Sequence, residues 1–401
     1  MKIVHICIAN YYADGYGYQE NLLTKYNKIQ GNDVTIITSV RNYSPETGDF
    51  VYENPRIYKN NEGIKVIRLQ YRFKFFGKKI MKTIGSTKKF YYSLKNEKPD
   101  MIFSHNLNFL DILFVKHYVK RHKKIIWFVD NHGDYVNTGK TFFSLKILHG
   151  TIWKTIIKSC DKYISKYYGV LPIRNKFLKE VYQVPENKID LLFMGADDEE
   201  LESALLSDKF IMRKNYDIPE DAFVIVTGGK IDLRKNIHIL LEAFSGVKKD
   251  NIYLIVFGTV TNEMKSKIEE YKSCPRIVFT GWMNQEDIYR LFLSADLAIF
   301  PGTHSVLWEQ ACAAGVPCVF KYWEGITHVD VNNNCILLKE ISCEILAETI
   351  NSLVNDVEKY AQLKYNAKGS AHKNFLYSEI SKKLMNDYSN CLKYTLSGKD
   401  V

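Results

Sequence analysis

The chain has 401 residues, of which 46% are hydrophobic and 25% charged, and its formal net charge is +10. A chain of this length exceeds what one hydrophobic core usually organises, so two domains are expected. The composition is that of an ordinary soluble globular protein, and no apolar run approaches the roughly 20 residues that a membrane-spanning helix requires.

The cysteines and the N-terminus both favour a cytoplasmic protein. The eight cysteines are scattered, with no CxxC pair and no Cys/His metal spacing, so reduced thiols are expected. The first ten residues, MKIVHICIAN, are interpreted as a buried strand and not as a signal peptide, because no cleavage-like site follows the short apolar run.

Positive charge is concentrated in residues 71–98, where nine Lys or Arg alternate with Phe and Tyr, and 116–124 adds KHYVKRHKK. This mixture suits an anionic membrane surface or a polyanionic acceptor. A solvated helix face is the equally weighted alternative. Peripheral association with the inner face of the plasma membrane through 71–98 is therefore an expectation, whereas no nucleic-acid-binding module accompanies the charge.

Strands and helices alternate along the first half of the chain. Apolar patterning predicts strands at 2–9, 33–39, 64–69, 100–105, 123–129, 161–164 and 189–193, and helices at about 19–30, 78–95 and 174–181. The loop at 11–18 carries Gly15 and Gly17 and is interpreted as the floor of a cleft. It lacks the third glycine of a dinucleotide fingerprint.

Two predicted strands end in polar residues that include a histidine. His105 follows the strand at 100–105, and His132 lies in the segment DNHGD after the strand at 123–129. Open α/β sheets place their sites at the carboxyl ends of the strands, so both histidines are expected at the same rim.

The domain boundary is expected near 196–215, a charged segment in which Asp197 and Asp198 are interpreted as linker or cap residues and not as metal ligands. The predicted domains are 1–200, Rossmann-like and acceptor-binding, and 201–375, Rossmann-like and donor-binding. A helix at about 376–401 is expected to pack back onto the first domain.

The second half repeats the alternation and opens with a strand at 223–227. The glycine pair ending at Gly229 would let backbone approach a ligand, and Lys230 and Lys235 could bracket a diphosphate. Solvated lysines in a surface turn are the alternative reading. Further strands are predicted at 252–257, 277–282, 298–300, 318–320 and 335–338, with helices at about 262–272, 285–293, 306–314, 343–355 and 375–396.

The segment 295–321, ADLAIFPGTHSVLWEQACAAGVPCVFK, predicts a strand, a loop, a helix and another strand. The loop 302–305 precedes the helix, where free backbone N–H groups could hold a phosphate. Glu309 lies about one turn into that helix and could accept hydrogen bonds from two sugar hydroxyls. Together these features predict a nucleotide-sugar site.

A family resemblance rests on four segments in order: GGKIDLRKNIHILLEAF, YLIVFGTV, VFTGWMNQEDIYRLFLSADLAIFPG and EQACAAGVPCVF. They resemble the donor domain of GT-B glycosyltransferases, most like the retaining family 4 (glycosyl transferases group 1), over about 224–338. GYGYQENL, DNHGD and FMGADDEE are weaker upstream matches. The resemblance implies an α/β GT-B fold, two Rossmann-like parallel domains facing a central cleft.

The resemblance also implies residue roles. Lys230, where the family usually has an arginine, and Lys235 would neutralise the donor diphosphate, and Glu309 would bind the nucleotide ribose. His132 would contact the donor sugar or stabilise developing positive charge. The predicted catalytic residues are His132, Lys235 and Glu309, and the predicted donor-binding residues are Gly15, Gly17, Gly229, Lys230, Lys235, Gly281, Trp282, Thr303, His304, Ser305, Val306 and Glu309.

One departure from the family concerns the E-x7-E motif, in which the first glutamate touches the transferred sugar. Pro301 stands eight residues before Glu309, and the loop is shortened to 302–305, so the first acid is absent. Thr303, His304 and Ser305 could still offer hydrogen bonds there.

The expected function is retaining transfer of a sugar from a UDP- or GDP-sugar to a glycan, a capsule or surface polysaccharide, or a lipid-linked acceptor. No metal and no further cofactor are expected, because lysines and backbone N–H groups would stabilise the leaving diphosphate. A GT-B nucleotide-sugar epimerase and a non-catalytic nucleotide-sugar-binding subunit remain alternatives, whereas no carboxylate pair is positioned for a glycosidase.

Overall fold

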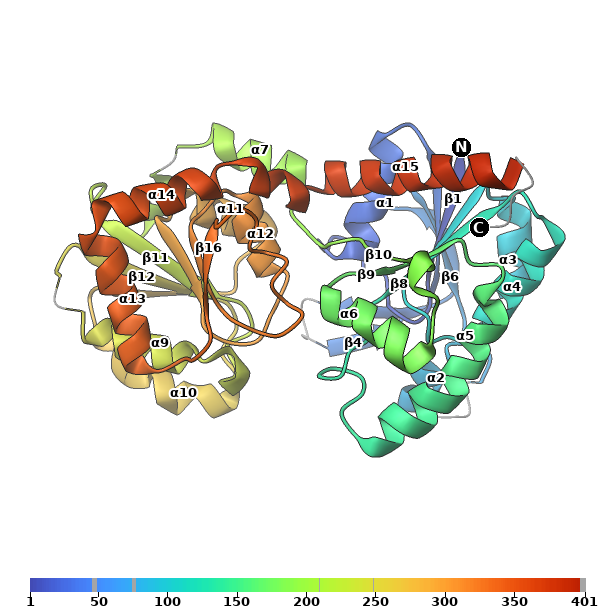
Figure 1. Ribbon diagram of the computed structural model, residues 1–401, viewed down its shortest axis with the longest axis horizontal. Helices are drawn as coiled ribbons and strands as arrows, with labels where there is room; N and C mark the ends of the chain where they lie inside the picture. Colours follow the sequence, from blue (N-terminus) through green and yellow to red (C-terminus); the bar gives the residue numbers. More distant parts are fainter. Residues whose placement is uncertain (45–48, 74–76, 209, 248, 397–401) are drawn as a thin grey trace. The chain divides into compact units, whose positions relative to one another are not determined.

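The computed structural model describes residues 1–44, 49–73, 77–208, 210–247 and 249–396, and the chain forms two compact units (Figure 1). One unit comprises Met1–Phe193 with Ile380–Val401, and the other comprises Met194–Glu379. Each contains a mostly or wholly parallel sheet, which confirms the predicted α/β class. Residues 74–76 of the basic region and 397–401 of the predicted last helix lie outside the described residues.

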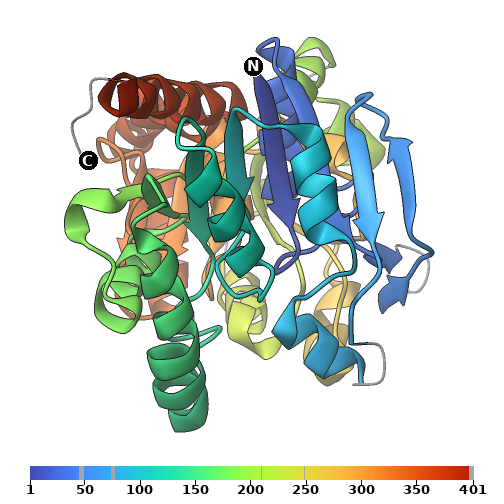
Figure 2. The ribbon, with the colours of Figure 1, turned by 90° about the vertical axis from the view of Figure 1, so that its right-hand side faces the viewer.

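The first unit is built on an eight-stranded sheet whose strands stand side by side in Figure 2. In sheet order the strands are β10 (Ile189–Leu191), β9 (Lys166–Gly169), β8 (Ile126–Asn131), β7 (Met101–Ser104), β1 (Lys2–Cys7), β2 (Asp33–Ser39), β6 (Lys65–Leu69) and β5 (Arg56–Lys59). Only β5 is antiparallel to its neighbour. A separate hairpin pairs β3 (Arg41–Ser44) with β4 (Asp49–Tyr52).

The central strands are apolar because both of their faces are covered. All six residues of β8 are buried, as are all four of β7. The helical segments of this unit are α1 (Gln19–Ile29), α2 (Lys78–Ile84), α3 (Phe90–Glu97), α4 (Ile112–Arg121), the π-helix η1 (Phe143–Trp153), α5 (Lys154–Asp161), α6 (Pro172–Phe177), the π-helix η2 (Leu178–Tyr182) and the 3-10 turn η3 (Glu186–Lys188).

The helix α15 (Tyr377–Leu396) packs against α1 of the first unit (Figure 1), and Nδ2 of Asn27 donates to Oγ of Ser381 at 2.7 Å. The last segment of the chain therefore packs on the first unit from Ile380 onward. None of the helices in the described residues is long and apolar enough to cross a membrane.

Two predicted elements of the first unit are wrong. The helix expected at 78–95 is split into α2 and α3, because Gly85 has a φ of 55° and its Cα faces Phe109 so closely that a Cβ would lie 2.6 Å from that side chain. The strand expected at 161–164 is instead the end of α5 and a turn, and the strand β9 begins at Lys166. Buried Ile157 and Cys160 follow helical spacing in α5, which the short apolar window at 161–164 conceals.

The second unit contains a six-stranded sheet in which every pair is parallel. Its order is β13 (Ile277–Gly281), β12 (Ile252–Phe257), β11 (Phe223–Gly228), β14 (Leu297–Phe300), β15 (Cys318–Lys321) and β16 (Cys335–Leu338). The helical segments are α7 (Asp198–Leu206), α8 (Ile211–Asn215), η4 (Leu233–Lys235), α9 (Ile237–Ser245), α10 (Asn262–Glu269), η5 (Glu270–Ser273), α11 (Gln285–Ser294), α12 (Leu307–Ala313), α13 (Cys343–Asn355), α14 (Val357–Ala367) and η6 (Ser370–Phe375).

Two glycines allow the backbone to cross closely at the carboxyl ends of β11 and β12. Gly229 and Gly258 have φ values of 105° and 112°, and a Cβ on Gly258 would lie 1.9 Å from the carbonyl oxygen of Gly229. Residues with a side chain are excluded from this crossing. It brings the turns that follow two neighbouring strands together at the edge where parallel sheets bind ligands.

Candidate functional site

The loop 302–305 of the second unit is fixed by the turn that carries Lys235. The backbone N–H of Thr303 donates to the carbonyl oxygen of Arg234 at 3.0 Å. Gly302 approaches so closely that a Cβ there would lie 2.3 Å from Cα of Lys235. The two sequence segments predicted to hold a diphosphate are therefore in direct contact.

The ammonium group of Lys235 supports this loop from the inside. Its Nζ donates to the carbonyl oxygen of Thr303 at 2.6 Å and to that of His304 at 3.2 Å. Burial lowers the pKa of Lys235 to about 8, even though the nearby Asp232 acts to raise it. Lys235 is thus a cation only part of the time at mildly alkaline pH, and an anion bound beside it would favour its charged form.

Glu309 is a fully buried carboxylate on α12. Its Oε1 accepts hydrogen bonds from Nε2 of His304 at 2.8 Å and from Nε2 of His328 at 2.9 Å. Its Oε2 is also buried but has no hydrogen-bond partner among the described residues. A buried carboxylate oxygen rarely remains without a donor, so Oε2 is the atom of this site that is available to a ligand.

The two histidines reach Glu309 from different segments. His304 precedes α12 and packs against Trp308, and His328 lies between β15 and β16. Burial acts to raise the pKa of Glu309, but His304 and His328 outweigh it and hold that pKa well below its usual value. Glu309 is therefore an ionised acceptor across the physiological range.

The same three side chains could also hold a metal ion. His304, Glu309 and His328 each offer one ligand atom, and these atoms lie within 4.8 Å of one another. Two imidazoles and one carboxylate are ligands suited to zinc and similar cations. A bound cation would replace the two N–H donations that Oε1 receives.

The remaining predicted donor-binding residues of this unit surround the same edge. Lys230 is exposed and directly follows the glycine crossing. Gly281 has a φ of 73° at the end of β13, and Trp282 is 72% exposed. Ser305 has a buried Oγ without a partner among the described residues. Thr303 and Val306 are half-buried, and α12 begins only at Leu307.

The length of α12 changes the expected electrostatics. The helix has seven residues and no side-chain cap at Val306. Because so short a helix carries a small dipole, the positive charge near the loop comes from Lys235 and Lys230 more than from the helix terminus.

Described residues of the second unit line several cavities. One of about 340 Å³ is lined by Gly258, Gly281 and Phe279 together with residues of α10. It adjoins the turn predicted to receive the base. Another of about 530 Å³ is lined by α7, the segment 313–317 and α14, and shares no residue with the predicted site.

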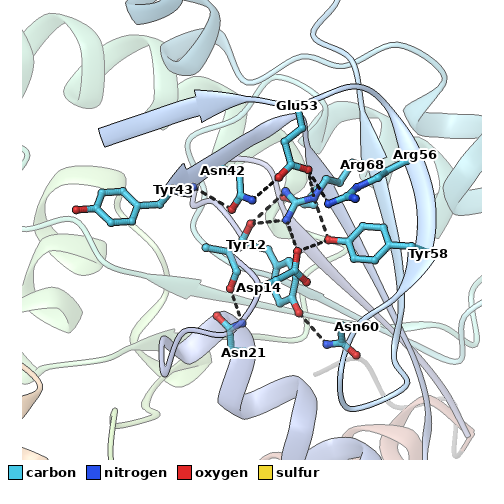
Figure 3. Close-up of polar contacts among 12 residues, drawn as sticks. Tyr12, Asp14, Asn21, Asn42, Tyr43, Glu53, Arg56, Tyr58, Asn60 and Arg68 are labelled. Atoms are coloured by element: carbon cyan, nitrogen blue, oxygen red, sulfur yellow. Dashed lines mark hydrogen bonds and ion pairs between the residues drawn. The ribbon is translucent and has the colours of Figure 1, made fainter. Parts of the chain in front are cut away.

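The glycine loop of the first unit is anchored by a buried arginine (Figure 3). Arg68 donates through both terminal nitrogens to the carbonyl oxygen of Tyr12 at 3.2 Å and forms an ion pair with Asp14 at 3.0 Å. Tyr58 also donates to Asp14 at 2.5 Å. Gly15 follows with a φ of 77°, and a Cβ there would meet open space. The anchor therefore ends just before Gly15, beside which the space is open.

Gly17 belongs to the same loop, and aromatic rings flank it. Tyr16 and Tyr18 stack with their centroids 5.2 Å apart, and Tyr11 meets Tyr18 edge-on. These rings hold the second half of the loop, whereas polar contacts hold the first half.

The prediction that His105 and His132 share a rim is confirmed. Both lie beside Asp130 at the end of β8, with Oδ2 of Asp130 3.2 Å from Nδ1 of His105 and 3.3 Å from Nε2 of His132. Neither N–H is aimed straight at the oxygen. Burial acts to raise the pKa of Asp130, but the two imidazoles hold it well below its usual value.

Three residues of these sites were missed by sequence reasoning. His328 has no spacing relation to Glu309, Arg68 is a lone basic residue inside an apolar strand, and Asp130 was noted only as a neighbour of His132. The buried charge of Arg68 in β6 was the available signal, because an arginine is almost never buried without partners.

Comparison with known proteins finds a family similarity within the second unit. Residues 208–370 match the family model described as glycosyl transferases group 1. The chain is 24% identical over 244 residues to an uncharacterized glycosyltransferase of Methanocaldococcus jannaschii, covering 57% of this chain and 62% of that protein. It is 24% identical over 221 residues to the capsular polysaccharide biosynthesis glycosyltransferase CapM of Staphylococcus aureus, covering 52% and 57%.

Structural similarity covers a larger share of this chain than sequence similarity does. The structure of HepE from Anabaena in complex with UDP and glucose matches 97% of this chain and 100% of that one, with a TM-score of 0.64 and 15% identity. The matched regions span less than two thirds of the two curated relatives. Residues 208–370 thus carry the pattern of the glycosyl transferases group 1 family, and the chain as a whole has the GT-B fold seen in solved glycosyltransferase structures.

Proposed function

We propose that this protein is a retaining glycosyltransferase that moves a sugar from a UDP- or GDP-sugar to a glycan, a capsule or surface polysaccharide, or a lipid-linked acceptor. The match of residues 208–370 to the group 1 family supports the reaction class. The similarity to a protein named for capsular polysaccharide biosynthesis supports the acceptor class. The structure of HepE, which is a complex with UDP and glucose, supports a uridine nucleotide among the donors.

The observation that carries the proposal is the state of Glu309. A side chain with 0% exposure keeps its charge and leaves Oε2 without a partner, next to a loop that Lys235 holds. Leaving a buried carboxylate oxygen unsatisfied costs free energy of about 1–3 kcal/mol, which a pair of ribose hydroxyls would recover on binding. Lys235 and Lys230 would then neutralise the diphosphate attached to that ribose.

In the proposed reaction the bond between the anomeric carbon and the diphosphate oxygen breaks, and the acceptor hydroxyl attacks from the same face. The hydroxyl proton passes to an oxygen of the leaving diphosphate, so the products are a glycoside and a nucleoside diphosphate. Lys235 and Lys230 would stabilise the negative charge that develops on the leaving group. His132, together with the loop at Gly15 and Gly17, is proposed to face the donor from the first unit.

The test measures nucleoside diphosphate release and glycan extension with UDP-sugars and GDP-sugars, with and without acceptor fractions. Glu309→Ala and Lys235→Ala should each abolish transfer, whereas the exposed Glu340→Ala should not. Unchanged turnover in both site variants would refute the assignment. An epimer formed from donor alone would indicate an epimerase. Binding of UDP without release from any donor would indicate a non-catalytic subunit.

We also propose peripheral attachment to an anionic membrane through residues 71–98. In the described part of this region, Lys88, Lys89 and Lys95 are exposed, and Tyr92 on α3 is 69% exposed. An aromatic side chain between cations suits the interface of an anionic bilayer. The triple variant Lys88→Glu, Lys89→Glu and Lys95→Glu should lose sedimentation with phosphatidylglycerol vesicles. The charge-matched variant of Lys267, Lys272 and Lys339 should retain it.

A further inference from the structure

A continuous polar chain crosses the interior of the first unit behind His132. Nδ1 of His5 lies 3.1 Å from Nε2 of His105, and Nε2 of His5 lies 2.9 Å from Oδ1 of Asn27. Asn27 then donates to Ser381, which donates to Oε1 of Gln30 at 3.0 Å. His5, His105 and Asp130 have 0% exposure, so their contacts are shielded from bulk solvent.

The donor and acceptor of each hydrogen bond in this series can be assigned by starting from Ser381. Ser381 has one proton and gives it to Gln30, so it accepts from the amide nitrogen of Asn27. Oδ1 of Asn27 can only accept, so Nε2 of His5 carries a proton. Burial first, and then the neighbouring His105, lowers the pKa of His5, so its ring is neutral and Nδ1 is an acceptor.

This series of hydrogen bonds also determines which ring nitrogens of His105 carry protons. Since Nδ1 of His5 accepts, Nε2 of His105 must donate. Its other nitrogen, Nδ1, lies 3.2 Å from Oδ2 of Asp130. The two atoms are not aligned as a hydrogen bond, but an unprotonated nitrogen this close to a buried negative oxygen would be repelled by it. Both ring nitrogens of His105 are therefore protonated, and His105 is the cation that compensates Asp130.

Apart from His132, no other described group beside Asp130 can supply a compensating positive charge. Cys7 also faces Asp130 from β1, but burial raises the pKa of its thiol, which stays neutral. The backbone N–H of Asn106 donates to Oδ1 of Asp130 at 2.6 Å and adds no charge. His132 is the remaining neighbour, with Nε2 3.3 Å from Oδ2.

We propose that His105 is a positioning residue that takes the compensating proton of Asp130, so that His132 works as a neutral imidazole with its proton on Nε2. The inference rests on the proposed function, because it assigns a role to His132 toward the donor. Nδ1 of His132 has no hydrogen-bond partner among the described residues. As an unprotonated nitrogen it can accept a hydrogen bond from a hydroxyl group of the donor sugar but cannot act as a cation.

The decisive measurement is the protonation of the two rings in the full-length protein without substrate. Long-range 1H–15N spectra of histidine-labelled protein at neutral pH distinguish protonated from bare ring nitrogens, and the spectra of His132→Asn and His105→Gln assign the signals. We expect two protonated nitrogens in His105 and a bare Nδ1 in His132. A doubly protonated His132 beside a neutral His105 would overturn the proposal.

A variant tests the coupling between the rings. In His105→Gln the carboxylate of Asp130 loses its cation, so the titration of His132 should move to higher pH by about one to three units. His117→Gln, on the exposed face of α4, should leave the titration unchanged. An unmoved His132 in folded His105→Gln would contradict the proposal. Should that variant not fold, Asp130→Asn is the alternative, in which His105 should lose its second proton.

Transfer activity provides a separate readout. If the protein transfers sugar, the acidic limb of the pH profile of kcat should shift upward in His105→Gln, while the KM for the donor changes little. If the protein transfers no sugar, the ring protonation states still decide the inference, so its failure and the failure of the proposed function remain distinguishable.

Discussion

His328 donates from Nε2 to Oε1 of Glu309 at 2.9 Å, although 19 residues separate them in the chain. The two residues belong to segments that flank β15, and the contact forms only because β15 and β16 pair in the sheet. His304 donates to the same oxygen from the other side. The carboxylate is therefore held through one oxygen, and the second is presented without a protein donor from the described residues.

The first prediction concerns the histidine clamp, by which we mean His304 and His328 with the Oε1 atom of Glu309 that they hold. Replacing His328 by Phe removes one hydrogen bond to a charged group, a loss of about 1.5–3 kcal/mol, so the Kd for UDP or GDP should rise roughly tenfold to a hundredfold. His328→Gln should restore much of the affinity, because its amide can still donate. Calorimetric titration gives both constants.

The matched control for the clamp is His117→Phe, an equal change of side chain at an exposed position of α4. It should not alter nucleotide affinity. Equal affinity of folded His328→Phe and the unmodified protein would show that the clamp does not prepare Glu309 for a ligand.

The second prediction is a pH dependence that arises from Lys235. Its pKa of about 8 means that the cation is lost as pH rises through that value, and diphosphate affinity should fall with it. Lys235→Arg should bind with little pH dependence between about 7 and 9, because the guanidinium stays charged. The test is to measure the affinity of both proteins for UDP across this pH range. AMP, which lacks the diphosphate, is the control ligand.

The same lysine makes a prediction for stability with the opposite sign. Its folded pKa lies below the ordinary value of 10.5, so between about pH 8 and 10.5 the unfolded chain binds more protons and the contribution of Lys235 to stability rises with pH. Lys235→Met should flatten this part of the curve of Tm against pH. A Tm profile that is identical in both proteins would contradict a buried, neutralised Lys235.

The sequence predicted the sheet-forming parts of the fold well because their signal is local. The strands at 33–39, 252–257 and 335–338 have the predicted bounds. The first two are almost entirely buried, as apolar runs in a parallel sheet are, and the third is an apolar edge strand. The helix at 343–355 is also confirmed, and Ser342 caps it. Elements failed where a local pattern was ambiguous, as at 161–164, or where one glycine breaks a helix, as at Gly85.

The candidate site was predictable only in part, for a physical reason. Lys235 and Glu309 lie in segments whose local pattern predicts turns and helices beside a sheet edge. The partners that set their chemistry are distant in sequence: His328 approaches Glu309 through strand pairing, and His5 joins His105 because β1 lies beside β7. No spacing rule relates such residues, so only the folded chain reveals their contacts.

The third prediction concerns metal ions. The proposed mechanism uses lysines, so dialysis against EDTA should leave transfer activity and UDP affinity unchanged. Because His304, Glu309 and His328 could hold a cation, the opposite result is informative. Loss of activity that Zn²⁺ or Mn²⁺ restores in the unmodified protein but not in His328→Gln would replace the lysine mechanism by a metal site. Elemental analysis of the purified protein is the independent check.

The fourth prediction concerns the anchor of the glycine loop. Arg68→Met leaves Asp14, Glu53 and the carbonyl oxygen of Tyr12 without their buried cation, and breaking such a network costs about 3–5 kcal/mol. We expect a large fall in the Tm of the first unit and faster amide exchange in residues 12–18. Arg56→Met is the control, since Arg56 is half-exposed and its ion pair with Glu53 is worth at most about 1 kcal/mol.

In the double variant Arg68→Met and Asp14→Asn, the loss should be smaller than the sum of the two single losses, because each single change leaves an uncompensated charge that the pair of changes removes. Full additivity would show that Arg68 stabilises the sheet without acting on the loop.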